Sequence, residues 1–441
     1  MRTPVSVALG RAARGITRLR GGSGSAFPGL VVEKFDPKFL ARTLAKLPRG
    51  VVVVSGTNGK TTTTKMVVEL LRGQGLKVFT NSSGSNFTRG VVASLLGEMS
   101  LTGRLDADIA VLELDEAHAV HFVRAVRPNY SLLLNVMRDQ LDRFGEIDTT
   151  AGLLRTIAEH TTEGVVLNRE DARVAAIADS LSGQEVRYFG LDASLRHHFP
   201  SDDELHATTA AVEAVEGNDD DTSSEAHTST ATGRPADVLL TGLENHGGTF
   251  RIGEKTVSTD LKVNGAYNTY NAAAALALVR MALGAAVDEA ALIASLAEVS
   301  PAFGRGESLV VNGQPLDLVL VKNPSGFRLG LSSFSAAGVA TMIAINDNYA
   351  DGRDMSWLWD VSFGSLADEG VRMVSGVRAH DMGLRLAYDE VRFDALEPDL
   401  KTGLEEFLRA APDAPKRIFC TYTAMLALRK HLSSYTEVEA F

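Results

Sequence analysis

The chain has 441 residues, 45% of them apolar and 22% charged, which is enough for two or three domains with ordinary globular cores. Its single cysteine, Cys420, excludes a disulfide framework and a cysteine-cluster metal site, and it fits a reducing compartment. The formal charge of −11 is concentrated between His197 and Gly233, a stretch with nine acids and no lysine or arginine, so the acidity does not define a substrate, and no basic patch indicates nucleic-acid binding.

The N-terminal segment is basic. Residues 1–32 contain no acid but five arginines, namely Arg2, Arg11, Arg14, Arg18 and Arg20. A basic amphipathic segment can contact anionic lipid, and the commoner alternative is a solvated helix or a frayed end. Residues 21–36 predict a flexible link and residues 37–45 a short helix. We therefore assign residues 1–45 to a basic segment and linker.

This segment does not resemble a secretory signal, because the apolar run Val5–Leu9 is too short and arginines follow it. No apolar run reaches transmembrane length. We therefore expect a cytoplasmic protein, and the basic segment leaves peripheral contact with the inner face of the cell membrane open.

The next stretch is typical of a nucleotide triphosphate site. Val51–Val54 predicts a buried parallel strand, which leads through a glycine-bearing turn into a run of helical spacing. Such a turn directs backbone N–H groups and the positive end of the helix dipole at one point, which suits a phosphate. Lys60 adds a cation and the Thr61 hydroxyl a Mg²⁺ ligand. The predicted binding residues are Gly56, Thr57, Asn58, Gly59, Lys60, Thr61 and Thr62. The alternative is an ordinary strand–turn–helix with a surface lysine.

Four more strands are predicted, and polar residues follow each of them. Their ranges are Lys77–Thr80, Ile109–Glu113, Tyr130–Asn135 and Gly164–Asn168. Strands that alternate with helices predict a doubly wound, mostly parallel sheet, with ligands beyond the carboxyl ends of the strands. Glu113 is the strand-end carboxylate best placed to hold Mg²⁺, and the alternative is a solvated acid. His118 and His121 have no third strong ligand in the sequence, so we interpret them as helix-face residues rather than a metal pair.

Residues 200–233 are rich in serine, threonine and acids and lack aromatics, so they predict a disordered loop inserted in a domain. Two short strands, Val238–Leu240 and Thr249–Ile252, are predicted after it. Asn268 and Asn271 then lie at the start of an alanine-rich helix. Their amides are candidates for contact with a purine base, although amides also serve as plain helix caps.

A second, smaller α/β domain is predicted from residue 304 onwards, after a central domain over residues 46–303. Its strands are predicted at Leu316–Val321, Thr341–Asn346, Arg372–Ser375 and Arg417–Thr421. Polar turns again follow the strands, above all Asp351–Asp360, which is denser in charge and aromatics than a core strand needs. Cys420 lies in an apolar strand and is interpreted as a packed residue rather than a nucleophile.

The chain resembles the Mur ligase superfamily of ATP-dependent amide-forming enzymes and, within it, the MurT family. The Mur ligase motifs are Gly56–Thr62, Asp139–Gly145, Leu167-Asn168, Tyr267–Ala273 and Gly304-Arg305. The MurT-like stretches are Gly24–Leu30, Val321–Gly326 and Asn346–Asp360. The resemblance implies a P-loop ATPase domain followed by a Rossmann-like C-terminal domain.

The resemblance also implies an activity. Such enzymes amidate the α-carboxylate of D-glutamate in the stem peptide of lipid II, giving D-isoglutamine for peptidoglycan. They are expected to use ATP and Mg²⁺, to form an acyl phosphate, and to receive ammonia from a GatD-like glutamine amidotransferase in a heterodimer. One aspartate of the 351–360 loop is expected to complete the partner's glutaminase triad. We favour Asp354, with Asp351 and Asp360 behind it, and Glu113 supports the phosphate chemistry. The alternative for these aspartates is helix capping or binding of Mg²⁺-nucleotide. Arg305 is expected to stabilise the nucleotide.

The sequence departs from the family pattern in two places. Many MurT proteins carry a four-cysteine zinc ribbon, but one cysteine cannot bind zinc in that way, so we expect no structural zinc. Gln140 stands where typical Mur ligases have a histidine near a metal, which leaves Asp139 and Asp142 as charged candidates. The carbamylated lysine of many Mur ligases has no assigned position here.

Two other functions compete with this prediction. Another Mur-type ligase, such as a folylpolyglutamate synthetase, shares the Gly-Thr-Asn-Gly-Lys turn, but the Asp351–Asp360 segment argues against it. A regulatory nucleotide-binding module without ligase chemistry is disfavoured, because Lys60, Thr61, Glu113 and a whole C-terminal domain are present.

Overall fold

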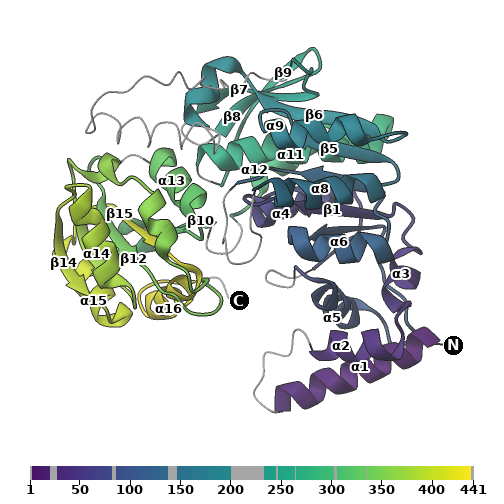
Figure 1. The fold of residues 1–441 in the computed structure, drawn as a ribbon, viewed down its shortest axis with the longest axis horizontal. Helices are drawn as coiled ribbons and strands as arrows, with labels where there is room; N and C mark the ends of the chain where they lie inside the picture. The colour runs from purple at the N-terminus through teal and green to yellow at the C-terminus, as the bar shows by residue number, and fades with distance from the viewer. Residues whose placement is uncertain are drawn as a thin grey trace, which may run out of the picture. The chain divides into compact units, whose positions relative to one another are not determined.

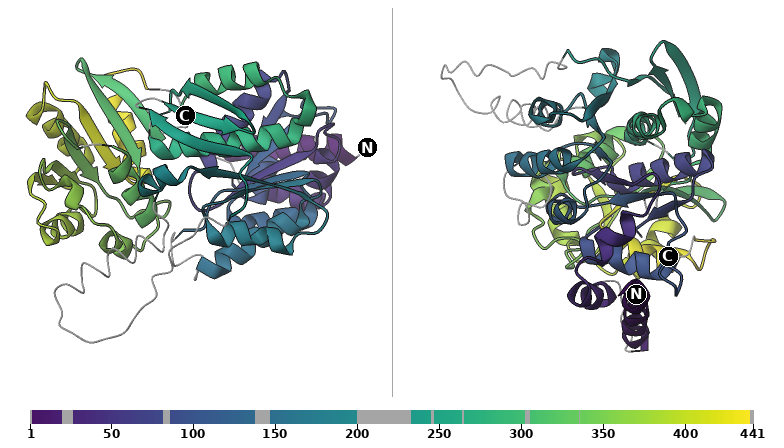
Figure 2. Two further views of the ribbon diagram at one scale, coloured as in Figure 1. Left: turned by 90° about the horizontal axis from the view of Figure 1, so that it is seen from above. Right: turned by 90° about the vertical axis from the view of Figure 1, so that its right-hand side faces the viewer.

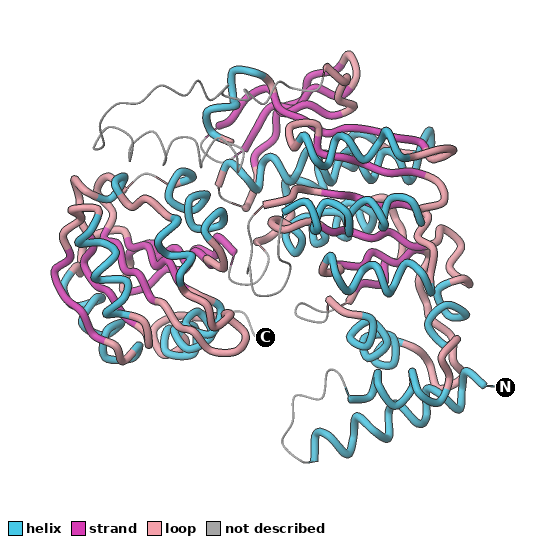
Figure 3. The backbone as a smooth tube through the Cα atoms, in the orientation of Figure 1, coloured by secondary structure: helices cyan, strands magenta, loops and turns pink. Residues whose placement is uncertain are grey.

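The computed structural model describes residues 2–19, 27–81, 86–137, 147–199, 233–244, 247–263, 265–301, 305–334 and 336–438. The chain divides into two compact units (Figures 1 and 3). The first comprises residues 1–136, 146–261 and 268–299, and the second comprises residues 137–145, 262–267 and 300–441. Each is built around one sheet and is described by itself below.

The first unit has a nine-stranded sheet in the order β2-β3-β1-β4-β5-β6-β7-β8-β9. Its strands are β1 (Val51–Ser55), β2 (Val78–Thr80), β3 (Ile109–Glu113), β4 (Tyr130–Leu133), β5 (Gly164–Asn168), β6 (Glu185–Leu191), β7 (Val238–Glu244), β8 (Gly247–Ile252) and β9 (Lys255–Asp260). The strands from β2 through β7 are parallel, and β8 and β9 are added antiparallel. Because β1 lies between β3 and β4, the turns after these three strands meet at one edge of the sheet.

Helices cover both faces of this sheet (Figure 2). The described helices that follow the N-terminal ones are α4 (Lys60–Gly73), α5 (Thr88–Glu98), α6 (Glu116–Ala125), α8 (Ile147–His160), α9 (Ala172–Ala175), α11 (Ala266–Leu283) and α12 (Glu289–Glu298). Short 3₁₀ helices occur at η1 (Ala176–Ser180), η2 (Ala193–His198) and η3 (Gly284–Ala286). This is the doubly wound arrangement predicted from the alternation of strands and helices.

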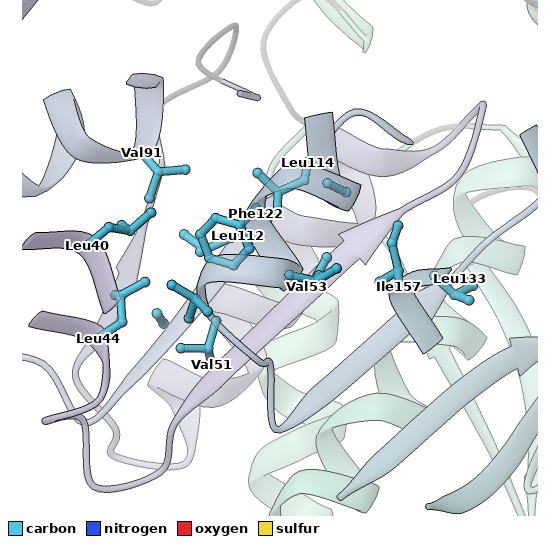
Figure 4. Packing of buried hydrophobic residues seen from close by; sticks show 14 of the residues in the cluster. Leu40, Leu44, Val51, Val53, Val91, Leu112, Leu114, Phe122, Leu133 and Ile157 are labelled. Carbon is cyan, nitrogen blue, oxygen red and sulfur yellow. The ribbon is translucent and has the colours of Figure 1, made fainter. Parts of the chain in front are cut away.

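The core explains why β1 is a continuous β-branched run. Val51 and Val53 point into a cluster with Leu112, Phe122 and Ile157 (Figure 4). The alternate residues of β1 are also fully buried, on the other face of the sheet. A strand covered on both faces has no solvent side, so it shows no alternation of apolar and polar residues.

The N-terminal residues pack onto this core rather than forming a link. The helices here are α1 (Arg2–Leu19), α2 (Phe27–Phe35) and α3 (Phe39–Leu44). Val32 of α2 and Leu40 of α3 enter the same apolar cluster as β1. The prediction of a flexible link over residues 21–36 is therefore wrong for residues 27–35. Gly29 lets α2 lie so close to α5 that a Cβ there would be 2.1 Å from the Arg89 carbonyl oxygen.

The second unit has a six-stranded sheet in the order β10-β11-β15-β12-β13-β14, in which only the β10–β11 pair is antiparallel. Its strands are β10 (Arg305–Val311), β11 (Gln314–Leu320), β12 (Ala340–Ala344), β13 (Val371–Ser375), β14 (Phe393–Glu397) and β15 (Lys416–Cys420). Its helices are α13 (Pro324–Ser333), η4 (Ser356–Asp360), η5 (Gly364–Leu366), α14 (Ala379–Tyr388), α15 (Leu400–Ala410) and α16 (Tyr422–Leu432).

The faces of this second sheet carry separate apolar cores. One joins Phe327 of α13 and Leu358 of η4 to the sheet, and the other joins Phe407 of α15 and Met425 of α16 to it. The predicted α/β fold of this part is confirmed. Strands β6, β9, β10 and β14 were not predicted. The acidic insert predicted to be disordered lies outside the described residues, apart from Gly233.

The close approach of α2 and α5 predicts a stability difference between two glycine substitutions. Gly29→Ala should destabilise the protein by about 1–3 kcal/mol, because the added methyl group meets backbone that cannot rotate away. Chemical denaturation of the full chain measures the change.

Gly15→Ala is the matched control, because a Cβ at Gly15 of α1 would have no heavy atom within 4 Å. There the higher helix propensity of alanine should give a gain of up to about 1 kcal/mol. Equal stability of the two variants would contradict the packing described here.

Candidate functional site

The turn between β1 and α4 has a backbone that only glycine adopts easily at two positions. Gly56 has φ +134° and Gly59 has φ +88°. A Cβ at Gly59 would also lie 2.8 Å from the side-chain oxygen of Asn271. The first-turn N–H groups of α4 have no intrahelical acceptors and carry the positive end of the helix dipole. The turn therefore fits an anionic phosphate group.

Asn135, which follows β4, fixes the shape of this turn. Its carbonyl oxygen accepts from the Thr57 N–H at 3.0 Å. Its side-chain oxygen accepts from the Asn58 N–H at 2.8 Å, and its side-chain NH₂ donates to the Asn58 carbonyl at 3.1 Å. These three bonds tie the turn to the neighbouring parallel strand, so its backbone is held in place before a ligand binds.

Lys60 is buried in the turn that it closes. Its Nζ donates to the carbonyl oxygens of Gly56 at 2.5 Å and Thr57 at 3.2 Å. It also forms an ion pair of 3.1 Å with Glu116, at the start of α6. Glu116 is only 1% exposed, so its charge depends on this partner. The lysine is thus held at this turn by groups of the protein itself.

Thr61 and Glu113 are brought together as predicted. The Thr61 hydroxyl donates to Glu113 Oε1 at 2.8 Å. Glu113 ends β3, and its backbone is clamped by Asn81, whose side chain accepts from the Glu113 N–H and donates to its carbonyl, both at 2.9 Å. Mg²⁺ is usually held by one or two protein oxygens together with phosphate and water. A hydroxyl and a carboxylate beside a phosphate turn fit that requirement.

The other residues predicted to bind the nucleotide do not all lie at this turn. Thr62 is buried on α4, and Asn271 is buried on α11 against Gly59. Asn271 therefore lies at the glycine turn, and its contact with a purine base stays a prediction. Asn268 is half-buried in the first turn of α11. Arg305 begins β10, and its side chain lies outside the described residues. Asp139, Gln140 and Asp142 lie outside them too.

His118 and His121 are exposed on α6. They line a cavity of about 570 Å³ together with residues of α2, α3 and α5, and the His118 ring lies 6.0 Å from that of Phe87. Within the described residues, no group of three or more histidine, cysteine or acidic side chains could hold a metal ion.

In the second unit, Asp351 anchors the loop after β12. Its carboxylate accepts from the Thr423 N–H at 2.7 Å, the Thr423 hydroxyl at 2.5 Å and the Asn348 N–H at 3.0 Å. Asp351 is 4% exposed, and its burial raises its pKa. Asn346 and Asn348 donate to the same Thr423 hydroxyl. The loop is therefore tied to the start of α16.

Asp354 lies in the same loop and is exposed. Its carboxylate accepts from the N–H of Ser356 at 2.9 Å, and hydrogen bonding with Ser356 holds its pKa below the usual range. Asp360 ends η4 and is half-buried. In that helix Trp357 is buried, whereas Trp359 is 46% exposed and stacks edge-on against Tyr388.

Cys420 is fully buried on β15, and burial raises the pKa of its thiol. The interpretation as a packed residue is confirmed.

Sequence reasoning gave no role to Glu116, Asn135, Asn81 or Thr423. The first three follow strands whose carboxyl ends meet at the turn. Their position just after these strands could have indicated a role at the turn.

Comparisons with known proteins agree with this geometry. The family model of the Mur ligase middle domain matches residues 54–279, and that of the MurT ligase C-terminal domain matches residues 320–425. The MurT subunit of the lipid II isoglutaminyl synthase (glutamine-hydrolyzing) of Streptococcus pneumoniae is 32% identical over 98% of both chains. The protein of that name from Staphylococcus aureus strain COL is 27% identical over 89% of both.

Solved structures share the fold. A MurF from Acinetobacter baumannii has a TM-score of 0.65 at 17% identity, covering 91% of this chain and 81% of its own. A MurF from Thermotoga maritima, solved in complex with ADP, has a TM-score of 0.60 at 17% identity, covering 90% of this chain and 84% of its own. A folylpolyglutamate synthase from Mycobacterium tuberculosis has a TM-score of 0.57 at 17% identity, covering 92% and 96%.

The ion pair between Lys60 and Glu116 predicts two separable effects. Lys60→Ala should lower ATP turnover at least about 100-fold, because it removes a positioned cation from the phosphate site. It should also lower the melting temperature, since Glu116 is left charged, buried and unpaired.

The double variant Lys60→Ala/Glu116→Gln should recover stability but not turnover. Arg72→Ala, which breaks an exposed ion pair near the end of the same helix, should leave turnover unchanged and lower stability by no more than about 1 kcal/mol. Phosphate release and thermal unfolding measure the two effects. Recovery of turnover in the double variant would show that Lys60 acts only through folding.

Proposed function

This chain belongs to the MurT family of Mur ligases, and from that membership we propose that it is the synthetase subunit of a lipid II isoglutaminyl synthase. It would amidate the α-carboxylate of D-glutamate in the stem peptide of lipid II. The observation that carries the proposal is the glycine turn with Lys60 behind it and the Thr61–Glu113 pair beside it. A second domain matching the MurT C-terminal family model supports this member of the superfamily over others.

The chemistry requires activation of a carboxylate. In the proposed reaction, a carboxylate oxygen attacks the γ-phosphorus of ATP, and ADP leaves. Ammonia then attacks the acyl carbon, phosphate leaves with the oxygen, and the nitrogen loses a proton. The protein contributes positioned charge rather than a covalent bond. Mg²⁺, held by Thr61 and Glu113, would neutralise phosphate charge during the transfer.

The ammonia source is proposed to be a separate GatD-like glutaminase. The S. pneumoniae relative is named as the subunit of a glutamine-hydrolysing enzyme. The one cysteine of this chain is buried with a raised thiol pKa, so it is unsuited to attack glutamine. Exposed aromatics of the 346–360 loop and its neighbourhood, Tyr349, Trp359 and Tyr388, support the docking of a partner protein there.

No helix among the described residues is both long and apolar enough to span a bilayer. A lipid-linked substrate lies in a membrane, however. The proposed place of reaction is therefore the inner face of the cell membrane, where this chain would act as a peripheral protein.

A direct substrate comparison tests the proposal. The full chain with a GatD-like glutaminase, ATP, Mg²⁺ and glutamine should convert lipid II to its amidated form, detected by mass spectrometry, with phosphate release to match. Ammonium salt should replace glutamine and the partner. Turnover of folate with glutamate, but not of lipid II with ammonia, would contradict the proposal.

We propose Asp354 as the residue that orients the partner's catalytic histidine, because Asp351 is occupied by its bonds to Thr423 and Asn348. Asp354→Asn should abolish glutamine-dependent amidation and keep ammonia-dependent amidation within about twofold, since it removes a group acting only on glutamine hydrolysis.

The other two aspartates supply the comparison. Asp351→Asn should cost about 1–3 kcal/mol of stability, because the amide cannot accept the same three hydrogen bonds. Asp360→Asn should leave both reactions intact. If Asp354→Asn still hydrolyses glutamine normally with the partner, the assignment is wrong.

A further inference from the structure

Helix α1 is fixed in orientation by polar contacts on one side. The Ser6 hydroxyl donates to Asp36 at 2.9 Å, and Arg42 bridges Asp36 and Thr3. Arg11 donates to the carbonyl oxygens of Leu96 and Met99 at the end of α5. In addition, a Cβ at Gly10 would be 2.5 Å from a methyl carbon of Leu96. The helix therefore keeps one face against α2 and α5, and its opposite face is set by this packing.

That opposite face carries no polar side chain where the structure describes it. The exposed positions of α1 are Pro4, Val5, Ala8, Leu9, Ala12 and Gly15. Val5 is 53% and Leu9 37% exposed, and they lie four residues apart, on the same side of the helix. A solvated surface helix normally turns charged or polar residues outward. Over its described side chains, the outward face of α1 is therefore apolar where a water-facing helix would be polar.

The positive charge of the N-terminal segment indicates what could cover the outward face of α1. Residues 1–32 contain five arginines and no acid, although the whole chain has a formal charge of −11. An apolar helix face with arginines along the same segment complements a bilayer surface with anionic headgroups. We propose that the outer face of α1, defined by Val5, Ala8, Leu9 and Ala12, docks at the headgroup–acyl boundary of an anionic membrane.

This inference deepens the proposed function, since it names the surface that would bring the enzyme to a lipid-linked substrate, but its evidence is the composition and packing of α1. A second copy of the chain is the other occupant to consider. Two copies of this arginine-rich, acid-free segment would repel each other in a symmetric dimer, whereas anionic lipid attracts the segment. The helix spans about 27 Å at 1.5 Å per residue, which is long enough to lie along a bilayer surface.

Vesicle sedimentation of the full chain tests the proposal in the absence of lipid II. The protein should bind vesicles containing phosphatidylglycerol and bind pure phosphatidylcholine vesicles much more weakly. Raising the ionic strength to about 1 M, where the Debye length falls to about 3 Å, should weaken binding. The variant Val5→Glu/Leu9→Glu should lower the bound fraction about tenfold, because it places two charges on the inserted face.

The matched control is Val310→Glu/Leu384→Glu, which changes the same residue types at exposed positions of the second unit and should bind like the unaltered protein. All three proteins should amidate lipid II in detergent micelles equally. The membrane proposal would be overturned if the α1 variant bound vesicles as well as the unaltered protein does, or if the unaltered protein did not bind them. Activity in micelles would still support the proposed enzymatic function in either case. Loss of a dimer in the α1 variant, seen by light scattering without an effect on vesicles, would assign the face to a second copy instead.

Discussion

The candidate site of the first unit depends on a buried ammonium group, that of Lys60, at the glycine turn between β1 and α4. Strand order sets this up, because β1 between β3 and β4 makes three strand ends converge. Lys60 leaves the turn directly into α4, where the helix dipole is also positive, so two positive features meet at one point. Glu116 and two turn carbonyls offset the lysine charge. In the proposed function a phosphate group would find this cation already in place, and direct contact with it would replace one of the three hydrogen bonds that the ammonium now donates.

Two asparagine side chains hold the backbone of this turn in place. Asn135 fixes the backbone on one side by accepting two hydrogen bonds and donating one. Asn271 closes the turn on the other side, where it occupies the space that a Cβ at Gly59 would need. Neither asparagine carries charge, so neither competes with the phosphate. Anchoring by neutral amides and neutralisation by Glu116 are therefore separate tasks carried by separate residues.

Elements and site residues could be predicted from the sequence where neighbouring residues determine them, and could not where residues distant in the sequence do. Strands β3 and β5 were predicted to the residue, because buried β-branched and aliphatic runs are local signals. Strand β6 carries arginine and glutamate on a partly exposed segment, and β14 has no fully buried residue, so neither has a clear period. Helix α2 follows a glycine- and serine-rich stretch whose composition suggests a link. Its contacts with residues distant in sequence, such as those of Val32 with the core and of Gly29 with α5, hold it in place. Thr423 lies 72 residues from Asp351, beyond the reach of any local pattern.

Two pairs of acids show most clearly what the sequence could not decide. Glu113 and Glu116, and likewise Asp351 and Asp354, are each three residues apart after a strand, and spacing alone gives no reason to separate their roles. Their bonding partners separate them. Glu116 and Asp351 are used up by the protein, one by an ion pair with Lys60 and the other by three hydrogen bonds from a distant helix start and its own loop. A carboxylate committed in that way cannot be released without leaving buried groups unpaired. In each pair, the chemistry we propose therefore falls to the other acid, because its bonds, from the Thr61 hydroxyl or the Ser356 backbone, leave it accepting capacity.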